Sequence, residues 1–434
     1  EQVQQRTESD FIPWFTGYWT QQWLTLKVAW YKLDSGEGRE PAEKRLALYL
    51  QEQYRERVLE PVAEEIDPSI RFCEYSLGGG EASLAEMRSK MTGTALDALQ
   101  ALGSDAREAK IVADDLITAN LAGHDSHGVG MLPFYVDSVA AGTLQPNQPA
   151  WLLNDCGAIL QFDGERGYGQ RVVREAMDAA IERVGHSGIV LLTVRNSHHM
   201  GRIGSYGEQA AAAGKVALFF VNVTDFPQPL VAPFGGSAPR FGTNPLCIAF
   251  PAGHREPAFI LDFATSMVAY GKTRVAYLAG QHFDEAVMLD AAGQPTADPA
   301  AMHETPSGAL RPIAAHKGGG LVAAIEFLAG LLSGGGTLQP DNVRAGGIVN
   351  NLTAILIDPE AVSDLDWLRA EYDAMAAYIR SSPPPPGQPP LLLAGEPERQ
   401  REAQRLAAGV EISDNEWAAI VAAARRAGVI DADQ

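Results

Sequence analysis

Gly-His-Asp-Ser-His-Gly-Val-Gly at residues 123–130 and Asn-Ser-His-His-Met-Gly at residues 196–201 are the two stretches that most constrain the fold. The first follows a predicted helix that stops at Gly123, and the second follows the apolar run Ile189–Val194, a predicted strand. Together they hold four of the nine histidines. Catalytic groups tend to lie in such loops, and histidine can transfer protons near neutral pH. The two turns are therefore candidate acid–base sites, although a loop histidine is more often a structural hydrogen-bonding group.

The chain beyond about residue 104 alternates apolar strands with helices. Ser104 or Asp105 can cap the first helix. Strands are expected at Ala158–Phe162, Ile189–Val194, Val216–Val223, Cys247–Phe250 and Ala258–Leu261. Further helices are expected at Gln170–Val184, Ile203–Ala213 and Leu321–Leu332, with a Ser413/Glu416 capping box before a last helix that ends at Gly428. This alternation predicts an α/β domain whose sheet is covered by helices.

The glycine pattern of a Rossmann dinucleotide site is absent. Such sites carry Gly-x-Gly-x-x-Gly directly after a strand, whereas Gly128-Val129-Gly130 is followed by Met131-Leu132-Pro133. The P-loop pattern is absent as well, which disfavours hydrolysis of nucleoside triphosphates. The histidine spacings match neither His-Glu-x-x-His nor a Cys/His set, so no metal is expected.

Composition limits the class of partner. The 434 residues are 46% hydrophobic, and Asp and Glu outnumber Lys and Arg 54 to 34, a formal charge of -20. Nucleic acid is not an expected partner because phosphate binding needs a basic surface, whereas an anionic small substrate needs only a local cationic pocket. The three cysteines (Cys73, Cys156 and Cys247) show no paired spacing, which favours the reducing cytoplasm. No membrane span or signal peptide is expected.

Residues 1–90 differ in character from the rest. They contain four of the seven tryptophans, a predicted charged amphipathic helix at Pro41–Asp67, and a glycine linker at 78–80. The favoured interpretation is a helical appendage of unknown role whose aromatic residues pack on themselves or on the main body. The alternative is an element that binds a membrane surface or a partner.

Several polar turns could bind an anion or a ribose. The backbone of Gly242–Pro245 could form an anion-binding nest, and Asp262 after its strand could hold ribose hydroxyls. Lys272 could pair with an anion, and the glycine-rich helix start at His316–Gly320 could bind one through free N–H groups. An ordinary turn, a solvated lysine and a helix cap are the competing interpretations.

In their order along the chain, these motifs resemble the malate/L-lactate dehydrogenase type 2 family. The likeness also includes Leu-Asp-Phe-Ala-Thr-Ser at 261–266 and Gly-Lys-Thr-Arg at 271–274, and it extends from about Ala106 to Gly428. The resemblance implies a mixed-sheet α/β fold that is not a Rossmann fold. Helical parts at 91–150 and 340–434 would flank a cofactor-binding core at 151–339. It also implies NAD or NADP as cofactor and a homodimer.

The resemblance assigns roles to individual residues. His127 would be the proton donor, and His199 would have a comparable role in some members. Apart from the resemblance, we expect Asp125 or Ser126 to orient the imidazole. Cofactor contacts would fall at His127, Gly201, Arg202, Ile203, Ile260, Leu261, Asp262, Phe263, Ala264, His316, Asn350, Gly395, Glu396, Pro397 and Glu398.

The chain departs from the family pattern beside the first histidine turn. Many members carry arginines that grip the substrate carboxylate where this chain has Met131 and Phe134. Arg202 or Lys272 would then have to hold the acid. The apolar replacements would leave room for a larger or aromatic substrate side chain.

The expected activity is the NAD(P)H-dependent reduction of 2-oxo acids to 2-hydroxy acids and the reverse oxidation. One alternative is a cyclic imino-acid reductase of the same family. Another is a non-catalytic interaction protein in which residues 1–90 are the working part. The choice between NAD and NADP, the particular acid and its stereochemistry stay open, since the acidic-residue rule for NAD belongs to the Rossmann fold.

Overall fold

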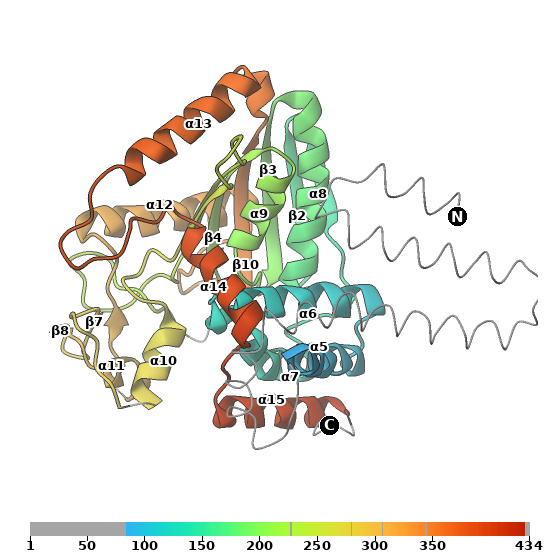
Figure 1. The fold of residues 1–434 in the computed structure, drawn as a ribbon. Coiled ribbons are helices and arrows are strands. Elements are labelled where there is room, and N and C mark those ends of the chain that lie inside the picture. The colour runs from blue at the N-terminus through green and yellow to red at the C-terminus, as the bar shows by residue number, and fades with distance from the viewer. Residues whose placement is uncertain (1–83, 226–227, 279, 306, 343–344, 430–434) are drawn as a thin grey trace, which may run out of the picture. The chain divides into compact units, whose positions relative to one another are not determined.

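The computed structural model describes residues 84–225, 228–278, 280–305, 307–342 and 345–429 (Figure 1). The expected helical appendage lies outside the described residues, apart from residues 84–90. These residues open helix α5 (Leu84–Ala101), which therefore continues across the expected boundary at residue 90. Within the described part, no helix is both long and apolar enough to cross a membrane.

The elements alternate between helices and strands along the chain. Besides α5, the helices are α6 (Ala106–Leu121), η2 (Asp125–His127), η3 (Val129–Met131), α7 (Leu132–Ala140), α8 (Gly169–Ser187), α9 (Gly204–Ala212), α10 (Tyr270–Leu278), α11 (Ala300–His303), α12 (His316–Ser333), η4 (Pro359–Ala361), α13 (Leu365–Arg380), α14 (Glu396–Ala408) and α15 (Asp414–Ala427). The strands are β1 (Trp151–Cys156), β2 (Ile159–Asp163), β3 (Ile189–His198), β4 (Val216–Val223), β5 (Leu246–Phe250), β6 (Phe259–Phe263), β7 (Met288–Leu289), β8 (Pro295–Thr296), β9 (Ala309–Leu310) and β10 (Val349–Ile357).

Seven strands form one mixed sheet in the order β1-β2-β3-β10-β4-β5-β6. Only β2 and β3 run parallel, and every other neighbouring pair is antiparallel. A Rossmann sheet is mostly parallel, so the predicted mixed-sheet fold without a Rossmann domain is confirmed. β7, β8 and β9 form a separate small sheet.

The central strand β10 was not predicted. It comes from the segment expected to be a helical C-terminal part, yet it pairs with β3 on one side and β4 on the other. Asn350 and Asn351 lie near its start, before the uninterrupted run Leu352–Ile357 that is typical of a strand. Both asparagines are buried and hydrogen-bonded within the sheet.

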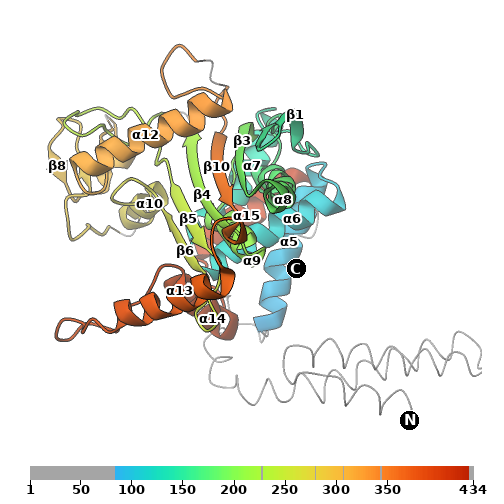
Figure 2. The same ribbon diagram turned by 90° about the horizontal axis from the view of Figure 1, so that it is seen from above.

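Helices cover both faces of the sheet, as predicted. Figure 2 shows α12 on one face and α8 with α9 on the other, and contacts between these helices and β3, β4, β5 and β10 agree with this view. The main core lies between α8, α9 and the sheet, where Val172, Met177, Leu192 and Phe219 are fully buried. Burial of such side chains is the main source of stability of a fold of this size.

α5, α6, α7 and α15 pack together as a helical layer below the sheet in Figure 1. The predicted caps are present: Asp105 accepts a hydrogen bond from Glu108 N at 2.7 Å, and Ser413 accepts one from Glu416 N at 3.3 Å. These bonds satisfy N–H groups that would otherwise lack a partner at the helix starts. A second core holds the layer together around Leu99, Leu116 and Tyr135.

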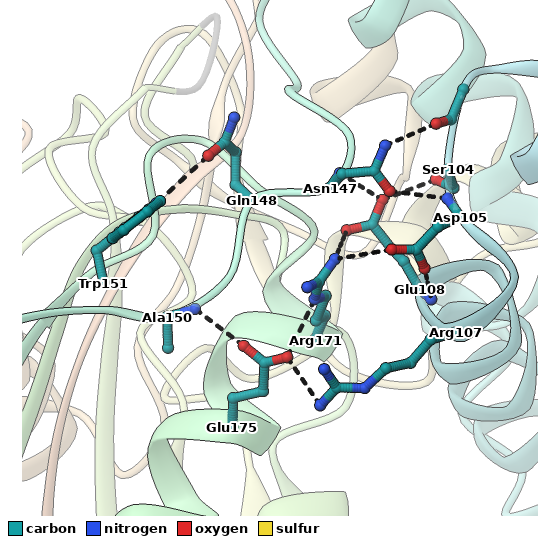
Figure 3. Close-up of polar contacts among 11 residues, drawn as sticks. Ser104, Asp105, Arg107, Glu108, Asn147, Gln148, Ala150, Trp151, Arg171 and Glu175 are labelled. Carbon is teal, nitrogen blue, oxygen red and sulfur yellow. Dashed lines mark hydrogen bonds and ion pairs between the residues drawn. The ribbon is translucent and has the colours of Figure 1, made fainter.

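A buried ion pair fastens α8 to α6 (Figure 3). The fully buried Glu108 receives Arg171 Nη1 at 3.2 Å and the hydroxyl of Ser104 at 2.8 Å. Arg171 Nε also donates to Glu175 at 3.1 Å, and Asn147 N donates to Glu108 at 2.7 Å. The network fixes the first turn of α8, which carries Gln170, against the helix that leads to the first histidine turn.

Candidate active site

His127 lies at the end of η2, directly after α6. Asn120 at the end of α6 shapes this turn, because its amide donates to Asp125 at 2.7 Å and its oxygen accepts from Val129 N at 2.8 Å. Gly128 is required here, since a Cβ atom would collide with the Asn120 side chain. The sequence pattern of the turn is thus explained by close packing around one asparagine.

His127 and His199 meet, although 72 positions separate them. His127 Nδ1 lies 3.2 Å from His199 Nε2, and the two rings are stacked at 5.3 Å. His199 Nδ1 lies 2.8 Å from the hydroxyl of Tyr135 in α7, and Gln170 Nε2 donates to the same hydroxyl at 2.7 Å. The structure thus brings together the two histidines predicted for the site.

Burial keeps these groups neutral. It lowers the pKa of His127 to about 4, with smaller contributions in the same direction from His124 and Arg202. Burial also lowers the pKa of His199 well below its usual value and raises that of Tyr135. The imidazoles are therefore uncharged near pH 7.

Asp125 and Ser126, the expected orienting residues, have other neighbours. Asp125 forms a two-pronged ion pair with Arg405 of α14, at 2.6 and 2.9 Å. Ser126 is exposed, and its Cβ lies against Gly271 of α10. Among the described residues neither side chain is hydrogen-bonded to His127, which bonds to His199 instead.

The Gly201 turn gathers several of the expected cofactor residues. Gly201 has a φ of 70°, and a side chain there would collide with Asp115 Oδ2. Arg202 is buried and ion-paired with Glu208, while Asp262 at the end of β6 accepts a hydrogen bond from Gly204 N at 2.7 Å. The turn after β3 and the end of β6 therefore lie side by side.

Buried polar atoms without a hydrogen-bond partner gather around this turn. They include Gln170 Oε1 and Arg202 Nε. Burial raises the pKa of Asp115 to about 7, against the opposing effects of Ser205 and Arg202. Buried polar groups normally have partners, so this cluster fits a ligand with several hydrogen-bonding atoms, such as a dinucleotide.

The Gly395–Glu398 turn reaches the same region from the C-terminal part of the chain. Gly395 begins α14 with a φ of 88°, and Ile260 N donates to Ala394 O at 3.3 Å. Glu398 lies 3.4 Å from His124 Nε2, while Glu396 bonds to Arg380 and to Leu393 N rather than facing the histidines. Pro397 is in the first turn of α14.

Two further expected cofactor residues have different surroundings. Asn350 holds the second histidine turn, since its oxygen accepts from Met200 N at 3.1 Å and its amide donates to Asn222 O at 3.0 Å. His316 is exposed, with its ring 6.0 Å from that of Phe234. It is the first residue of α12, so the glycine-rich segment expected to open the helix Leu321–Leu332 forms its first turn. Gly318 allows this start, because a Cβ atom there would collide with the backbone of Ile313.

The expected substrate residues are divided between the core and the surface. Met131 and Phe134 are partly buried against the second core, and Phe134 stacks on His198 at 5.8 Å. Lys272 is exposed in the first turn of α10, next to Gly271, which packs on Ser126.

Among the described residues, no three His, Cys, Asp or Glu side chains are grouped as a metal site would need.

Tyr135 and Gln170 belong to the site although no motif predicts them. Tyr135 lies in helix α7 among apolar residues, and Gln170 lies at the start of helix α8, so neither position suggests a role in the site. The one available signal is that Tyr135 follows the first histidine turn by eight residues, close enough for its helix to pack beside it.

Comparison with known proteins identifies the class. A sequence model described as malate/L-lactate dehydrogenase matches residues 87–421. Hydroxycarboxylate dehydrogenase B from Escherichia coli is 44% identical over 330 residues, which are 76% of this chain and 90% of that protein. L-lactate dehydrogenase from Cupriavidus necator is 43% identical over 310 residues, 71% of this chain and 88% of that protein.

A solved structure of a proposed malate/lactate dehydrogenase from E. coli matches with a TM-score of 0.75 at 42% identity, covering 79% of this chain and 95% of that one. The protein is thus an oxidoreductase of the dehydrogenase class. The chain belongs to the malate/L-lactate dehydrogenase family, and membership of this family implies a nicotinamide cofactor.

Proposed function

We propose that this protein interconverts 2-oxo acids and 2-hydroxy acids with NAD or NADP, and that His127 transfers the proton. The family and the names of the relatives, which act on lactate and on hydroxycarboxylates, support the substrate class. The observation that carries the assignment of His127 is its geometry: Nδ1 is held by His199, and Nε2 has no hydrogen-bond partner among the described residues.

A bound nicotinamide would supply the hydride that reduces C2 of the 2-oxo acid. His127 is neutral near pH 7, so it first takes up a proton from solvent. The imidazolium then gives its Nε2 proton to the carbonyl oxygen and returns to the neutral form, so that the oxo acid gains one hydride and one proton and becomes the 2-hydroxy acid. In the oxidative direction the same nitrogen takes the hydroxyl proton. His199 keeps the ring in place through both directions.

The Gly201–Ile203 turn and the 260–264 strand end would hold the cofactor, with the 395–398 turn beside them. The unpartnered polar atoms of Gln170 and Arg202 support this placement, because a dinucleotide carries amide, hydroxyl and phosphate groups that would satisfy them. Arg202 would contribute through its free Nε, since its other end is paired with Glu208.

Lys272 is the cation that we propose for the substrate carboxylate. Arg202, the other candidate, is already paired with a carboxylate. Lys272 is exposed, and its neighbour Gly271 packs on the η2 turn that carries His127. Met131 and Phe134 lie on the following turn and helix and would face an apolar substrate side chain, so acids larger than lactate are expected to be accepted.

Oxidation of NADH and of NADPH with a panel of 2-oxo acids tests the function. Pyruvate, oxaloacetate, 2-oxobutyrate and phenylpyruvate sample small, charged, aliphatic and aromatic side chains, and piperideine-2-carboxylate samples the imino acids. We expect turnover of at least one 2-oxo acid, with uncharged side chains preferred. Turnover of the imino acid alone, or no turnover and no binding of either dinucleotide, would contradict the proposal.

A further inference from the structure

The hydrogen bonds that begin at His127 continue inward past His199 to Tyr135 and Gln170, to which the reaction proposed above assigns no proton transfer. His127 Nδ1 faces His199 Nε2, His199 Nδ1 faces Tyr135 Oη, and Gln170 Nε2 donates to Tyr135 Oη. Tyr135 is fully buried and Gln170 almost so. These four side chains, from η2, the second histidine turn, α7 and α8, are called the tautomer chain below.

The direction of each bond in the tautomer chain follows from the protons available. All four groups are uncharged near pH 7, because burial lowers the pKa of both imidazoles and raises that of Tyr135. A neutral imidazole has one donor and one acceptor nitrogen, and a phenol has one proton to donate. Each link therefore has one donor and one acceptor, and fixing one end fixes the other.

Gln170 fixes the inner end. Its amide donates to Tyr135 Oη, and among the described residues the phenol proton has one other acceptor within reach, His199 Nδ1. With Nδ1 accepting, His199 carries its proton on Nε2 and donates it to His127 Nδ1. The proton of His127 must then be on Nε2.

We propose that Tyr135, oriented by Gln170, is a positioning residue that acts through His199 to hold the proton of neutral His127 on Nε2. Nε2 is the nitrogen left for the substrate, and an Nε2–H group donates a hydrogen bond to the carbonyl oxygen of a 2-oxo acid. The hydrogen bond from Nε2–H to a substrate carbonyl rests on the proposed function. The tautomer itself does not, because it follows from the side chains alone.

The tautomer chain also favours one form of the substrate. A 2-hydroxy acid would need His127 Nε2 as an acceptor, which requires the other tautomer and the reversal of every link. The ligand-free protein is therefore prepared for the oxo form. We expect a 2-oxo acid analogue such as oxamate to bind the enzyme–cofactor complex more tightly than a matched 2-hydroxy acid.

Nitrogen-15 NMR of the full chain, labelled at histidine, measures the tautomer, because protonated and unprotonated ring nitrogens resonate far apart. The signals of His127 are identified by their loss in His127→Gln. In the wild type we expect the proton on Nε2 of both His127 and His199. Tyr135→Phe should give a mixture of His127 tautomers.

Tyr168→Phe is the matched control. Tyr168 is a second buried tyrosine, with its ring 5.5 Å from that of Tyr135, and its hydroxyl is outside the tautomer chain. This variant should keep the wild-type tautomer and turnover. Tyr135→Phe should lower kcat about tenfold, because the imidazole is less firmly oriented, while the Kd for NADH changes little.

A wild-type His127 protonated on Nδ1 overturns the proposal, and this result needs no variant to fold. A wild-type tautomer in Tyr135→Phe overturns it too, even where turnover falls. If the wild type reduces no 2-oxo acid, the proposed function fails instead, while the NMR spectrum still decides which nitrogen carries the proton.

Discussion

His127 is positioned by side chains from distant parts of the chain. Its turn is shaped by Asn120, its ring is held by His199, and the neighbouring Asp125 is fixed by Arg405. Orientation of a reacting group in this way contributes to catalysis by keeping the productive geometry populated. The motif at residues 123–130 therefore determines the conformation of the turn, while contacts from other parts of the chain determine its position.

The pH dependence of the reaction follows from the low pKa of His127, about 4. Above that pKa the imidazole is neutral. His127 must therefore take up a proton before the 2-oxo acid can be reduced, whereas the neutral imidazole can accept the hydroxyl proton of the 2-hydroxy acid directly. We expect kcat/KM for the 2-oxo acid to fall about tenfold per pH unit between about pH 5 and 9, with kcat/KM for the 2-hydroxy acid flat. The tautomer ratio does not depend on pH and leaves these slopes unchanged.

Initial rates in both directions at saturating cofactor give these two profiles. A histidine with an ordinary pKa near 6.5 would give a different pattern. The kcat/KM for oxidation of the 2-hydroxy acid would then rise with pH up to about pH 6.5, and the kcat/KM for reduction of the 2-oxo acid would be flat below that pH. That pattern would show that burial does not keep His127 neutral.

Lys272 is expected to bind the substrate carboxylate without taking part in the chemistry. Lys272→Gln should therefore raise KM for the 2-oxo acid about tenfold, equivalent to about 1.4 kcal/mol, with kcat little changed. Steady-state kinetics at saturating cofactor measures this. Lys110→Gln, which removes an exposed lysine of α6 paired with Asp114, is the control. Equal effects of the two substitutions would argue against the role of Lys272.

At the scale of single residues, the sequence predicts the histidines but not their partners. His127 and His199 belong to short motifs that mark them as candidate site residues, whereas their contact was not predicted. Tyr135 and Gln170 are unpredictable because their hydrogen bonds cross between elements that only the fold brings together. Asp125 is the reverse case: its motif position suggests a role toward His127, but Arg405, 280 positions away, takes its carboxylate.

At the scale of elements, the ion pair between Glu108 and Arg171 is the main polar link from α6 to α8. Glu108→Ala would leave buried Arg171 with Glu175 at 3.1 Å and Asp105 at 3.8 Å. It would also remove the acceptor of Ser104 Oγ and Asn147 N, so we expect the free energy of unfolding to fall by about 3 kcal/mol. Urea denaturation measures this. Asp114→Ala removes an exposed pair with Lys110 and should cost less than about 1 kcal/mol. A loss for Glu108→Ala as small as that control would show that the network adds little stability.

Helices and strands with a clear apolar pattern were predicted about equally well, since the five expected strands coincide with β2, β3, β4, β5 and β6 to within a few residues. Capping residues and apolar periodicity mark α6, α8, α9 and α15, whose predicted limits lie within a few residues of those observed. β10 escaped prediction although Leu352–Ile357 is mostly apolar. The adjacent asparagines are typical of a loop, but in the structure they bond to the second histidine turn and to β4. Polar residues with a buried structural role can thus hide the start of a strand.

At the scale of the molecule, the site is assembled from four separate segments. The histidine turns, the end of β6 and the start of α14 come together through Glu398 with His124, Asp262 with Gly204, and Arg405 with Asp125. A Rossmann domain gathers its phosphate contacts in one glycine-rich turn. In the proposed cofactor site the corresponding contacts would come from several segments, which would explain why no single motif identifies it.

The most direct test of the central claim is steady-state turnover of His127→Ala. Loss of the proton-transferring group should lower kcat roughly 100- to 10,000-fold, while the Kd for NADH or NADPH, measured by fluorescence quenching, stays close to that of the wild type. His186→Ala, which removes an exposed histidine in the last turn of α8, should leave kcat unchanged. Near-normal turnover of His127→Ala, with cofactor binding intact, would contradict the assignment of His127 as the proton-transfer residue.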